Sequence, residues 1–386
     1  VIKTLERVSK HYYYIIRGKI KRMKIAILSM QRVINYGSVL QAYSLKEIIE
    51  SITGEHVDFI DPILDNTLAV NMPVRDSDDY TKKDQYGMWL TRNFRKALDK
   101  LNYKNLTKKI VEFQENELGM SYDYDPHKEK YDLVVEGSYE VFKASDKIYL
   151  HMYGAIDNAD TLITYAAACG SASIKGLSEQ NLVILKEMMK KYKFISVRDP
   201  HTYDYVKNLY DGKMDRHLDP VLVGNLYKRK HKPVKLKNYM IVYAYGNRIR
   251  DRREIEVIKD YAKKNKLQTI AVGAPQFWCD KFLVVSPLEV LDYFYYADCV
   301  VTDTFHGSIF SIINNCKFAT ILRKSNENKL GGLLRELGLE DRIVDSVDNL
   351  SEILEKNIDY AKISTLLEKE RVRTREYLTE QIESIK

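Results

Sequence analysis

The sequence contains few of the residues that stabilise secreted proteins, span membranes or bind structural metals. Its 386 residues include four cysteines, with no Cys-x-x-Cys pair and no Cys/His cluster at zinc spacing: Cys169, Cys279, Cys299 and Cys316. Three of them lie in apolar segments and are expected to be buried free thiols, which favours a reduced, cytoplasmic protein. No apolar run reaches the roughly 18 residues that a membrane-spanning helix needs.

Several common catalytic signatures are also missing. The chain has no P-loop, no Gly-x-Ser-x-Gly turn around a serine nucleophile and no His-Glu-x-x-His motif. Aspartate-rich metal loops are absent too, since Asp76, Asp78 and Asp79 lie in a polar stretch that is expected to be solvent-exposed. The sequence therefore predicts neither a metal ion nor an organic cofactor.

Positive charge is unevenly distributed along the chain. The net charge is +7, but residues 1–22 alone carry +6, so the other 364 residues carry only +1. A folded surface that binds nucleic acid is therefore not expected. Residues 1–22 are interpreted as a loose basic extension, because Met23 begins a stretch that resembles a natural protein start. The alternative is a peripheral contact of this extension with anionic lipid at the inner face of the membrane.

The first part of the chain, residues 23–223, is expected to be an α/β domain. A buried apolar run at 24–30 is followed by a turn at Ile34–Gly37, a helix from about 38 to 51 and another strand, which together form a β–α–β unit. Residues 65–130 are polar and are interpreted as a partly helical insertion rather than a sheet element. Strands and helices alternate after it, which favours a mostly parallel sheet.

The second part of the chain repeats this alternation. Residues 224–238 are the expected linker, with six Lys/Arg residues, one proline and few apolar side chains. A second α/β domain is expected at 239–348, and the charged segment 349–386 is expected to form helices that pack back across the domains. The predicted fold class is therefore α/β, with two Rossmann-like domains that face each other across a cleft. A ligand is expected at the carboxyl ends of their strands.

The sharpest local pattern is Val300–Phe310, in which an apolar strand ends near Thr302 and a helix begins near Phe305. Such a junction exposes backbone N–H groups and the positive end of the helix dipole, and so forms an anion site. His306 lies at this junction and can donate or accept a proton near neutral pH. Gly307 allows a ligand to approach the backbone closely.

A purely structural interpretation of the same segment fits the residue types equally well. Asp303 or Thr304 would then only cap the helix. His306 would be a hydrogen-bonded polar residue without a catalytic role.

Arg198 ends the apolar strand expected at 194–198. A buried arginine is costly unless it meets an anion. A phosphate or carboxylate of a ligand would serve. The neighbouring side chain of Asp199 would serve equally, in an internal ion pair.

Two glycine turns and one basic stretch are weaker candidates. Gly37 follows the first strand and offers backbone donors, and Glu136-Gly-Ser138 is a turn at a strand end. The first turn is not a Gly-x-Gly-x-x-Gly fingerprint, so the alternative is a tight turn that needs glycine. The arginine-rich stretch 248–253 is interpreted as a solvated helix start rather than a phosphate trap.

Taken together and in this order, these segments resemble the polysaccharide pyruvyl transferase family over most of residues 23–345. The resemblance is carried by MKIAILSMQRVINYGSVLQAYSL, TLITYAAACGSASI, FISVRDPHTYDYV, HLDPVL, VVTDTFHGSIFSIINNCKFATI and NKLGGLLRELGLEDRI. The most specific element is the Ser/Thr-Phe-His-Gly junction, here Thr304–Gly307. One segment departs from the family pattern Gly-Ser-Asp-Gln, because Tyr139 follows Gly137 and Ser138, so only these two residues are carried over.

The resemblance implies a fold like that of the GT-B glycosyltransferases, with the acceptor on the N-terminal domain and the donor on the C-terminal domain. It implies a cytoplasmic enzyme of exopolysaccharide or capsule synthesis. The donor would be phosphoenolpyruvate, and the acceptor a sugar or a lipid-linked glycan. The product would be a pyruvate ketal, with release of phosphate.

The resemblance and the chemistry together suggest roles for individual residues. His306 would be the general acid or base, and Arg198 would hold the carboxylate or phosphate of the donor. The amides of Gly307 and Ser308 would bind phosphate at the helix N-terminus. The expected substrate-binding residues are Asn35, Gly37, Gly137, Ser138, Asp303, Thr304, Phe305, Gly307 and Ser308.

Two other functions fit the sequence. A GT-B glycosyltransferase that uses a nucleotide-sugar would share the two domains and the phosphate-binding helix start, but it would need a ribose-binding acidic pair that the second domain does not clearly contain. The other alternative is a non-catalytic glycan-assembly protein. Tyr139 in place of the family aspartate is its main support.

Overall fold

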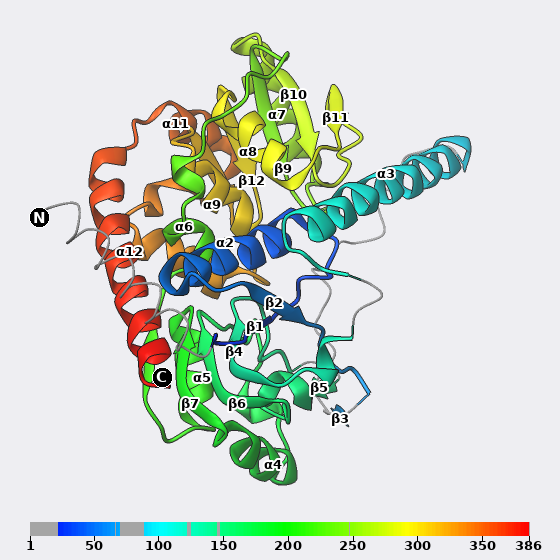
Figure 1. The fold of residues 1–386 in the computed structure, drawn as a ribbon. Helices are drawn as coiled ribbons and strands as arrows, with labels where there is room; N and C mark the ends of the chain where they lie inside the picture. The colour runs from blue at the N-terminus through cyan, green and yellow to red at the C-terminus, as the bar shows by residue number, and fades with distance from the viewer. Residues whose placement is uncertain are drawn as a thin grey trace, which may run out of the picture.

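The computed structural model describes residues 22–65, 67–69, 89–121, 125–144, 147–246 and 248–385. It contains two large sheets, one in each half of the chain, covered by helices (Figure 1). The predicted α/β class with two Rossmann-like domains is confirmed. Residues 1–21 lie outside the described part, so the two interpretations of the segment 1–22 stay predictions. Within the described residues, no helix is both long and apolar enough to cross a membrane.

The N-terminal domain is built on a six-stranded sheet. Its elements are β1 (Ile25–Leu28), α2 (Tyr36–Thr53), β2 (Val57–Ile60), β4 (Tyr131–Gly137), β6 (Ala159–Tyr165), α4 (Glu179–Met189), β7 (Tyr192–Val197), α5 (Pro200–Lys207), β8 (Met214–Arg216) and α6 (Pro220–Val223). The strands are all parallel, in the order β2-β1-β4-β6-β7-β8. The strand order reverses between β1 and β4, so the loops after these two strands frame a crevice.

The stretch predicted as an insertion, 65–130, is only partly outside the sheets. It holds the long helix α3 (Trp89–Asn116), which packs against α2. It also holds β3 (Thr67–Ala69), which pairs antiparallel with β5 (Lys147–Tyr149). The expectation that this stretch adds no strand was wrong, because three residues are too few to show an alternating apolar pattern.

The C-terminal domain has a second six-stranded sheet. Its elements are β9 (Tyr239–Tyr243), α7 (Arg252–Lys264), β10 (Gln268–Val272), β11 (Lys281–Leu283), α8 (Pro287–Tyr295), β12 (Cys299–Thr302), α9 (Phe305–Ile313), β13 (Phe318–Ile321), α10 (Gly332–Glu336) and β14 (Ile343–Val344). All strands are parallel, in the order β11-β10-β9-β12-β13-β14. This is the order of the dinucleotide-binding fold, with its switch point between β9 and β12.

The chain ends in α11 (Leu350–Glu355) and α12 (Tyr360–Glu383), and α12 runs back along the N-terminal domain (Figure 1). The Tyr377 hydroxyl donates to the carbonyl oxygen of Thr164 over 2.7 Å. The hydroxyl oxygens of Tyr165 and Thr374 are 3.1 Å apart. These bonds attach the last helix to β6, so the C-terminal segment belongs to the core of the first domain.

Tyr36 joins the two domains. It lies at the start of α2, and its buried hydroxyl donates to the carbonyl oxygen of Val285 over 2.8 Å and accepts the Val285 N–H over 3.1 Å. Around it, α2 packs on α8 and α6 packs on α9, so that one apolar core continues through both domains. The turn after β1 is thereby fixed against the loop before α8.

Tyr36→Phe is expected to lower the free energy of unfolding by about 1–3 kcal/mol, because the ring stays and both partners at Val285 lose a buried hydrogen bond. Chemical denaturation measures the change. Tyr43→Phe is the matched control, since the part-buried Tyr43 hydroxyl bonds only the Glu47 carboxylate, at 3.1 Å; it should cost less than about 1 kcal/mol. Equal losses in both variants would contradict the interdomain role of Tyr36.

Candidate active site

The candidate site lies where the loops after β1 and β4 meet the start of α9. His306, the second residue of α9, crosses from the C-terminal domain, and a Cβ atom on Gly37 would lie 2.1 Å from its Nδ1. The imidazole is 12% exposed. Gly37 does not have a positive φ. Glycine is therefore required at this position by the close approach of His306, and the alternative of a tight turn that needs glycine was wrong, because Gly37 lies in the first turn of α2.

Asp219 is the buried carboxylate on which the polar groups of the site converge. Its Oδ1 accepts the N–H of Val221 over 3.0 Å as the N-cap of α6. Its Oδ2 lies 3.4 Å from Nη1 of Arg198 and 3.7 Å from Nε2 of His306. The same oxygen accepts a hydrogen bond from Nε2 of Gln41. At 3.7 Å the histidine contact is electrostatic rather than a hydrogen bond.

Arg198 follows β7 and is paired with Asp219 rather than with its neighbour in sequence. The Asp199 carboxylate instead caps α5, accepting the N–H and the hydroxyl of Thr202 over 2.8 and 2.9 Å. The guanidinium carbon of Arg198 lies 4.4 Å above the centre of the Phe305 ring, a cation–π contact between the domains. The alternative of an Arg198–Asp199 ion pair was wrong, because the carboxylate of Asp199 is held by its own helix.

The electrostatics favour a neutral histidine beside an ionised aspartate. Burial lowers the pKa of His306, and the positive charge of Arg198 acts in the same direction, against the attraction of Asp219. Burial by itself would raise the pKa of Asp219, but His306, Arg198 and the N–H of Val221 outweigh it and hold this pKa below its ordinary value.

Four buried polar atoms around Asp219 have no hydrogen-bond partner among the described residues. They are Oε1 of Gln41, Oγ of Ser138, Nε of Arg198 and Nε2 of His306. Three come from the N-terminal domain and one from the C-terminal domain. Since native structures rarely leave buried polar atoms unpaired, a polar ligand or ordered water is expected to complete the site.

Asp303 lies between two arginines on the C-terminal side. Its Oδ2 is 3.4 Å from Nε of Arg248 and 3.4 Å from Nε of Arg323, whose other nitrogens bind Glu254 at 2.7 and 2.9 Å. Burial raises the pKa of Asp303 to about 6, against the effect of both arginines. Arg248 belongs to the stretch 248–253, where only a solvated helix start was predicted.

Thr304 is the N-cap of α9. Its Oγ1 accepts the N–H of Gly307 over 2.9 Å, and its carbonyl oxygen accepts the N–H of Ser308 over 3.3 Å. The expected use of these two amides as phosphate donors was therefore wrong, because both are already bonded within the helix. The first two helix positions, Phe305 and His306, provide the N–H groups that remain for an anion.

A cavity of about 40 Å³ opens beside the imidazole, with room for a few water molecules. It is lined by Asn35, Tyr243, Ala244, Tyr245, Thr304 and His306. Asn35 also caps α2, because its Oδ1 accepts the N–H of Gly37 over 2.8 Å. In the part of the chain that the structure describes, no group of three or more His, Cys, Asp or Glu side chains is arranged to hold a metal ion.

The turn after β4 brings its backbone into the same region. Gly137 has a φ of 127°, and a Cβ atom there would lie 2.2 Å from the carbonyl oxygen of Tyr165, so only glycine fits. The carbonyl oxygen of Ser138 accepts a hydrogen bond of 2.7 Å from Nε2 of Gln41. The turn is thereby held against α2.

The next two residues of this turn face the other domain. Burial raises the pKa of the Tyr139 hydroxyl, whose charged and polar neighbours include Tyr245, Glu140 and Arg198. The Glu140 carboxylate binds Nζ of Lys329 at 2.6 Å, which forms an ion pair across the cleft. Burial would raise the pKa of Glu140, but Lys329 and Arg198 outweigh it and lower this pKa.

Sequence reasoning missed three residues of this site: Gln41, Asp219 and Lys329. Gln41 and Asp219 lie inside quoted segments, and Leu-Asp-Pro at 218–220 predicts a helix cap. That capping role hides the second role of Asp219, which depends on partners far away in sequence. Lys329 also lies inside a quoted segment, NKLGGLLRELGLEDRI, but no local pattern there indicates its partner Glu140 across the cleft.

The fold and the site define a two-domain α/β protein with two Rossmann-like domains and a polar site between two facing switch points. The family model of polysaccharide pyruvyl transferases matches residues 35–325, which is most of the chain. The chain belongs to the polysaccharide pyruvyl transferase family and is accordingly a transferase of polysaccharide biosynthesis. The family suggested by the sequence segments is confirmed.

Solved structures with a similar fold come from several enzymes. A mutant O-GlcNAc transferase of Thermobaculum terrenum is 11% identical with a TM-score of 0.43, over 94% of this chain and 66% of that chain, so this chain spans slightly under two thirds of its length. UGT89C1 of Arabidopsis thaliana, complexed with quercetin, is 9% identical with a TM-score of 0.46, over 94% and 99%.

The UDP-GlcNAc 2-epimerase of Methanocaldococcus jannaschii, in complex with UDP-GlcNAc and UDP, is 11% identical with a TM-score of 0.46, over 90% of this chain and 99% of that chain. These likenesses say nothing about the activity of this chain. No curated protein matches it.

Gly37→Ala is expected to displace the imidazole of His306, because the new methyl group would lie 2.1 Å from Nδ1. Such overpacking should lower the free energy of unfolding by about 1–3 kcal/mol and shift the His306 ring signals in NMR spectra. Gly332→Ala is the matched control, since a Cβ atom there meets nothing within 4 Å. Unchanged His306 signals in Gly37→Ala would contradict the close approach.

Asp303→Asn is expected to change how stability depends on pH. Burial raises the folded-state pKa from 3.8 to about 6, so between these values the folded state holds a proton that the unfolded chain has lost. The contribution of Asp303 is therefore complete below its unfolded pKa and is lost as the pH rises through 6. Denaturant titrations should show that, from about pH 3 to pH 7, the free energy of unfolding of the wild type falls by about 3 kcal/mol relative to that of the variant.

Asp292→Asn is the control, because the contribution of Asp292 to stability is expected to change with pH in the opposite direction. Burial would raise the pKa of Asp292, but its hydrogen bonds with Arg229 and the N–H of Lys232 hold it below the ordinary value. Its stabilising contribution is therefore lost as the pH falls. If the stability difference for Asp303 changed with pH in the same direction as that for Asp292, the folded-state pKa of Asp303 would be lowered rather than raised.

Proposed function

We propose that this chain transfers the pyruvate group of phosphoenolpyruvate to a sugar of a polysaccharide or glycan precursor. The product is a cyclic ketal in which C2 of pyruvate joins two hydroxyl oxygens of the sugar, and phosphate is released. Membership of the polysaccharide pyruvyl transferase family supports the reaction class. The observation that carries the proposal is the cluster of buried, unpartnered polar atoms around Asp219, with Arg198 and His306 at its centre.

The reaction needs three proton transfers and one leaving group. The methylene carbon C3 of phosphoenolpyruvate takes up a proton and becomes a methyl group, which leaves cationic character at C2. A sugar hydroxyl adds to C2 and loses its proton, and the bond from C2 to the phosphate oxygen breaks with both electrons remaining on phosphate. A second hydroxyl then adds to C2 and its proton neutralises the phosphate.

His306 is the proposed proton-transfer group. Its lowered pKa favours the neutral imidazole, which can accept the proton of the attacking hydroxyl. The carboxylate of Asp219, 3.7 Å from Nε2, then stabilises the imidazolium that forms. C3 takes up its proton before the hydroxyl adds, so that proton comes from solvent water, and the imidazolium returns the hydroxyl proton to solvent after the addition.

The negative charges of the donor require cations and N–H groups. Arg198 is the proposed ligand of its carboxylate or phosphate, because Nε is unpartnered and the guanidinium already lies beside Asp219. The N–H groups at the start of α9 face the same region. The cavity of about 40 Å³ beside His306 lies next to these groups and is where the donor is proposed to bind.

Acceptor choice is assigned to the rim of the cleft. Tyr139 and Tyr245 come from opposite domains and offer aromatic rings on which a sugar ring can pack. Tyr139 replaces the aspartate of the family pattern, so we expect an acceptor different from that of relatives with aspartate. The acceptor is proposed to be a lipid-linked or free glycan precursor of capsule or exopolysaccharide. The four free cysteines fit a cytoplasmic enzyme.

Thermal denaturation with phosphoenolpyruvate tests the donor. A ligand of the native state raises the melting temperature by mass action, so phosphoenolpyruvate should raise it, and Arg198→Ala should abolish the shift. Arg375→Ala is the matched control, because this exposed arginine on α12 bonds only Ser51 at 3.1 Å and should leave the shift unchanged. A shift with uridine or guanosine diphosphate alone would favour the nucleotide-sugar glycosyltransferase. No shift with any of them would favour the non-catalytic glycan-assembly protein.

His306→Ala separates binding from chemistry in the same experiment. The variant should keep the melting shift with phosphoenolpyruvate, whereas phosphate release in the presence of sugar diols should fall by about 10²- to 10⁴-fold. Unchanged turnover in His306→Ala would remove this residue from proton transfer while leaving the donor assignment intact.

A further inference from the structure

The linker between the domains concentrates positive charge. Residues 224–238 contain six Lys/Arg and no Asp or Glu. They contribute +6 to a net charge of +7, and residues 1–22 contribute another +6, so the remaining 349 residues together carry −5. The described fold is thus slightly acidic except along this one segment.

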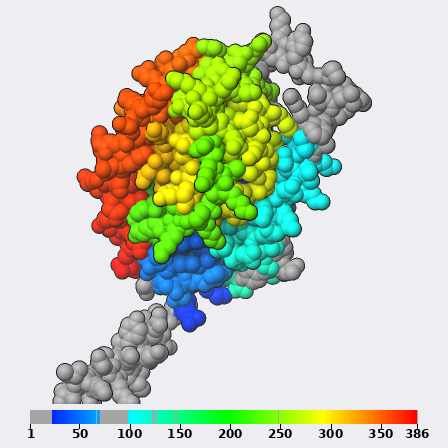
Figure 2. All heavy atoms as spheres, turned by 90° about the horizontal axis from the view of Figure 1, so that it is seen from above, coloured from blue at the N-terminus to red at the C-terminus, as the bar shows by residue number. Residues whose placement is uncertain are grey.

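The conformation of the linker places its lysines on one side. Val234 and Leu236 are partly buried against the core. Around them the chain exposes five lysines: Lys228, Lys230, Lys232, Lys235 and Lys237. None of the five makes an ion pair with a described residue. In Figure 2 the linker, drawn in green, crosses the face turned toward the viewer, between α3 in cyan and the yellow to orange elements of the C-terminal domain. We call these five side chains the lysine stripe.

The linker uses its arginine differently from its lysines. Arg229 turns inward and binds the buried carboxylate of Asp292 through both terminal nitrogens, with Nη2 3.0 Å from Oδ2. Asp292 also accepts the backbone N–H of Lys232 over 3.0 Å. The internal carboxylate is therefore neutralised by arginine, and the lysines remain unpaired toward solvent. Lysine is a hydrated, flexible point charge, which suits diffuse attraction to a charged surface better than recognition of one anion.

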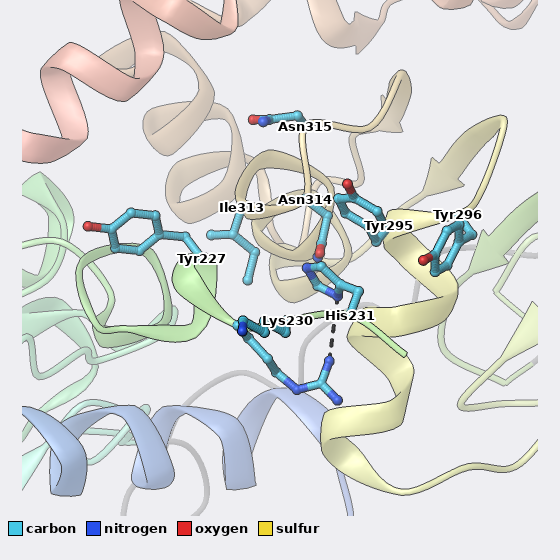
Figure 3. A pocket seen from close by; sticks show the side chains of 9 residues that line it. Tyr227, Lys230, His231, Tyr295, Tyr296, Ile313, Asn314 and Asn315 are labelled. Carbon is cyan, nitrogen blue, oxygen red and sulfur yellow. Dashed lines mark hydrogen bonds between the residues drawn. The ribbon is translucent and has the colours of Figure 1, made fainter. Parts of the chain in front are cut away.

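Two exposed tyrosines lie beside the stripe. Tyr295 and Tyr296, at the end of α8, are 51% and 41% exposed. With Tyr227, Lys230 and His231 they line an open pocket of about 420 Å³ (Figure 3). The His231 ring stacks on Tyr295, with centroids 4.2 Å apart and planes 10° from parallel, which fixes this tyrosine at the surface. Exposed tyrosines next to basic residues are typical of surfaces that meet lipid headgroups.

We propose that the lysine stripe, with Tyr295 and Tyr296, docks the protein on an anionic lipid bilayer. Unpaired lysines are attracted to the negative leaflet surface, and the tyrosine rings enter the headgroup layer. This surface is separate from the candidate active site, since Ile313 at the pocket lies seven residues, about 10 Å, along α9 from His306. Docking here neither depends on pyruvyl transfer nor occupies the cleft.

The two ends of the stripe are not equivalent. A groove of about 610 Å³ beside α3 is lined by Lys232 and Lys235, but also by Glu112, Glu117 and Glu289. These carboxylates weaken the positive potential near Lys235. The attraction to lipid should therefore depend mostly on Lys228 and Lys230, with a smaller contribution from Lys232, which also lines the groove.

Vesicle sedimentation with the full chain tests the proposal. The protein should bind phosphatidylcholine vesicles that contain about one third phosphatidylglycerol, and binding should weaken with added salt. Replacing Lys228, Lys230 and Lys232 together by Gln should reduce the partition coefficient about 100-fold, at roughly fivefold per lysine. Tyr295→Ser with Tyr296→Ser should reduce it further.

The matched control removes the same charge elsewhere. Lys186 on α4, Lys190 directly after α4 and Lys207 on α5 are exposed lysines of the N-terminal domain, and the variant in which Gln replaces all three should keep most of the binding. Equal losses in the two triple variants would overturn the proposal in favour of net charge alone. Unchanged vesicle binding of the linker variant would also overturn the proposal, because the contact would then lie elsewhere. Equal binding of the wild type to pure phosphatidylcholine vesicles would overturn it too. If the linker variant lost binding to heparin or DNA but kept its binding to vesicles, the partner of the lysine stripe would be a polyanion instead.

Discussion

A buried carboxylate between the domains is the constraint on which the functional half of this molecule depends. One oxygen of Asp219 starts α6, and the other faces Gln41, Arg198 and His306. A fully buried charge that loses its partners costs several kcal/mol. Because one of these partners belongs to the C-terminal domain, docking of the two domains and assembly of the polar site around Asp219 are one event. Separation of the domains needs water or a ligand to take the place of His306.

The two domains contribute different chemistry to this site. The N-terminal domain supplies the carboxylate and the guanidinium, at the carboxyl ends of parallel strands. The C-terminal domain supplies the imidazole and the first N–H groups of α9, a helix start that favours negative charge. Tyr36 and the Glu140–Lys329 ion pair hold the two surfaces together from either side. This division suits a group transfer in which donor and acceptor must meet across a cleft.

Sequence reasoning reached the fold class and the family because both rest on local patterns. Apolar runs, glycine turns and the junction around His306 are each contained within a few residues, and they keep their order along the chain. The side-chain partners of these residues could not be predicted from local patterns. That Arg198 would pair with Asp219 rather than Asp199 depends on how β7 and α6 are placed in space. The Gly307 and Ser308 amides were misjudged because the capping bond of Thr304 competes for them. The short strand β3 was missed because three residues carry no period.

The path of α12 has a consequence for how such proteins can diverge. Its side chains bond β6, although it follows the whole C-terminal domain in the chain. In terms of packing, the C-terminal sheet is an insertion into the first domain, bounded by residues 224–238 and by the short connection between α11 and α12. Exchange of the C-terminal domain between relatives therefore needs two breakpoints in the gene rather than one. A single crossover within the linker would join α12 from one parent to a β6 from the other, and the hydroxyl–carbonyl contacts between them would have to be compatible in both.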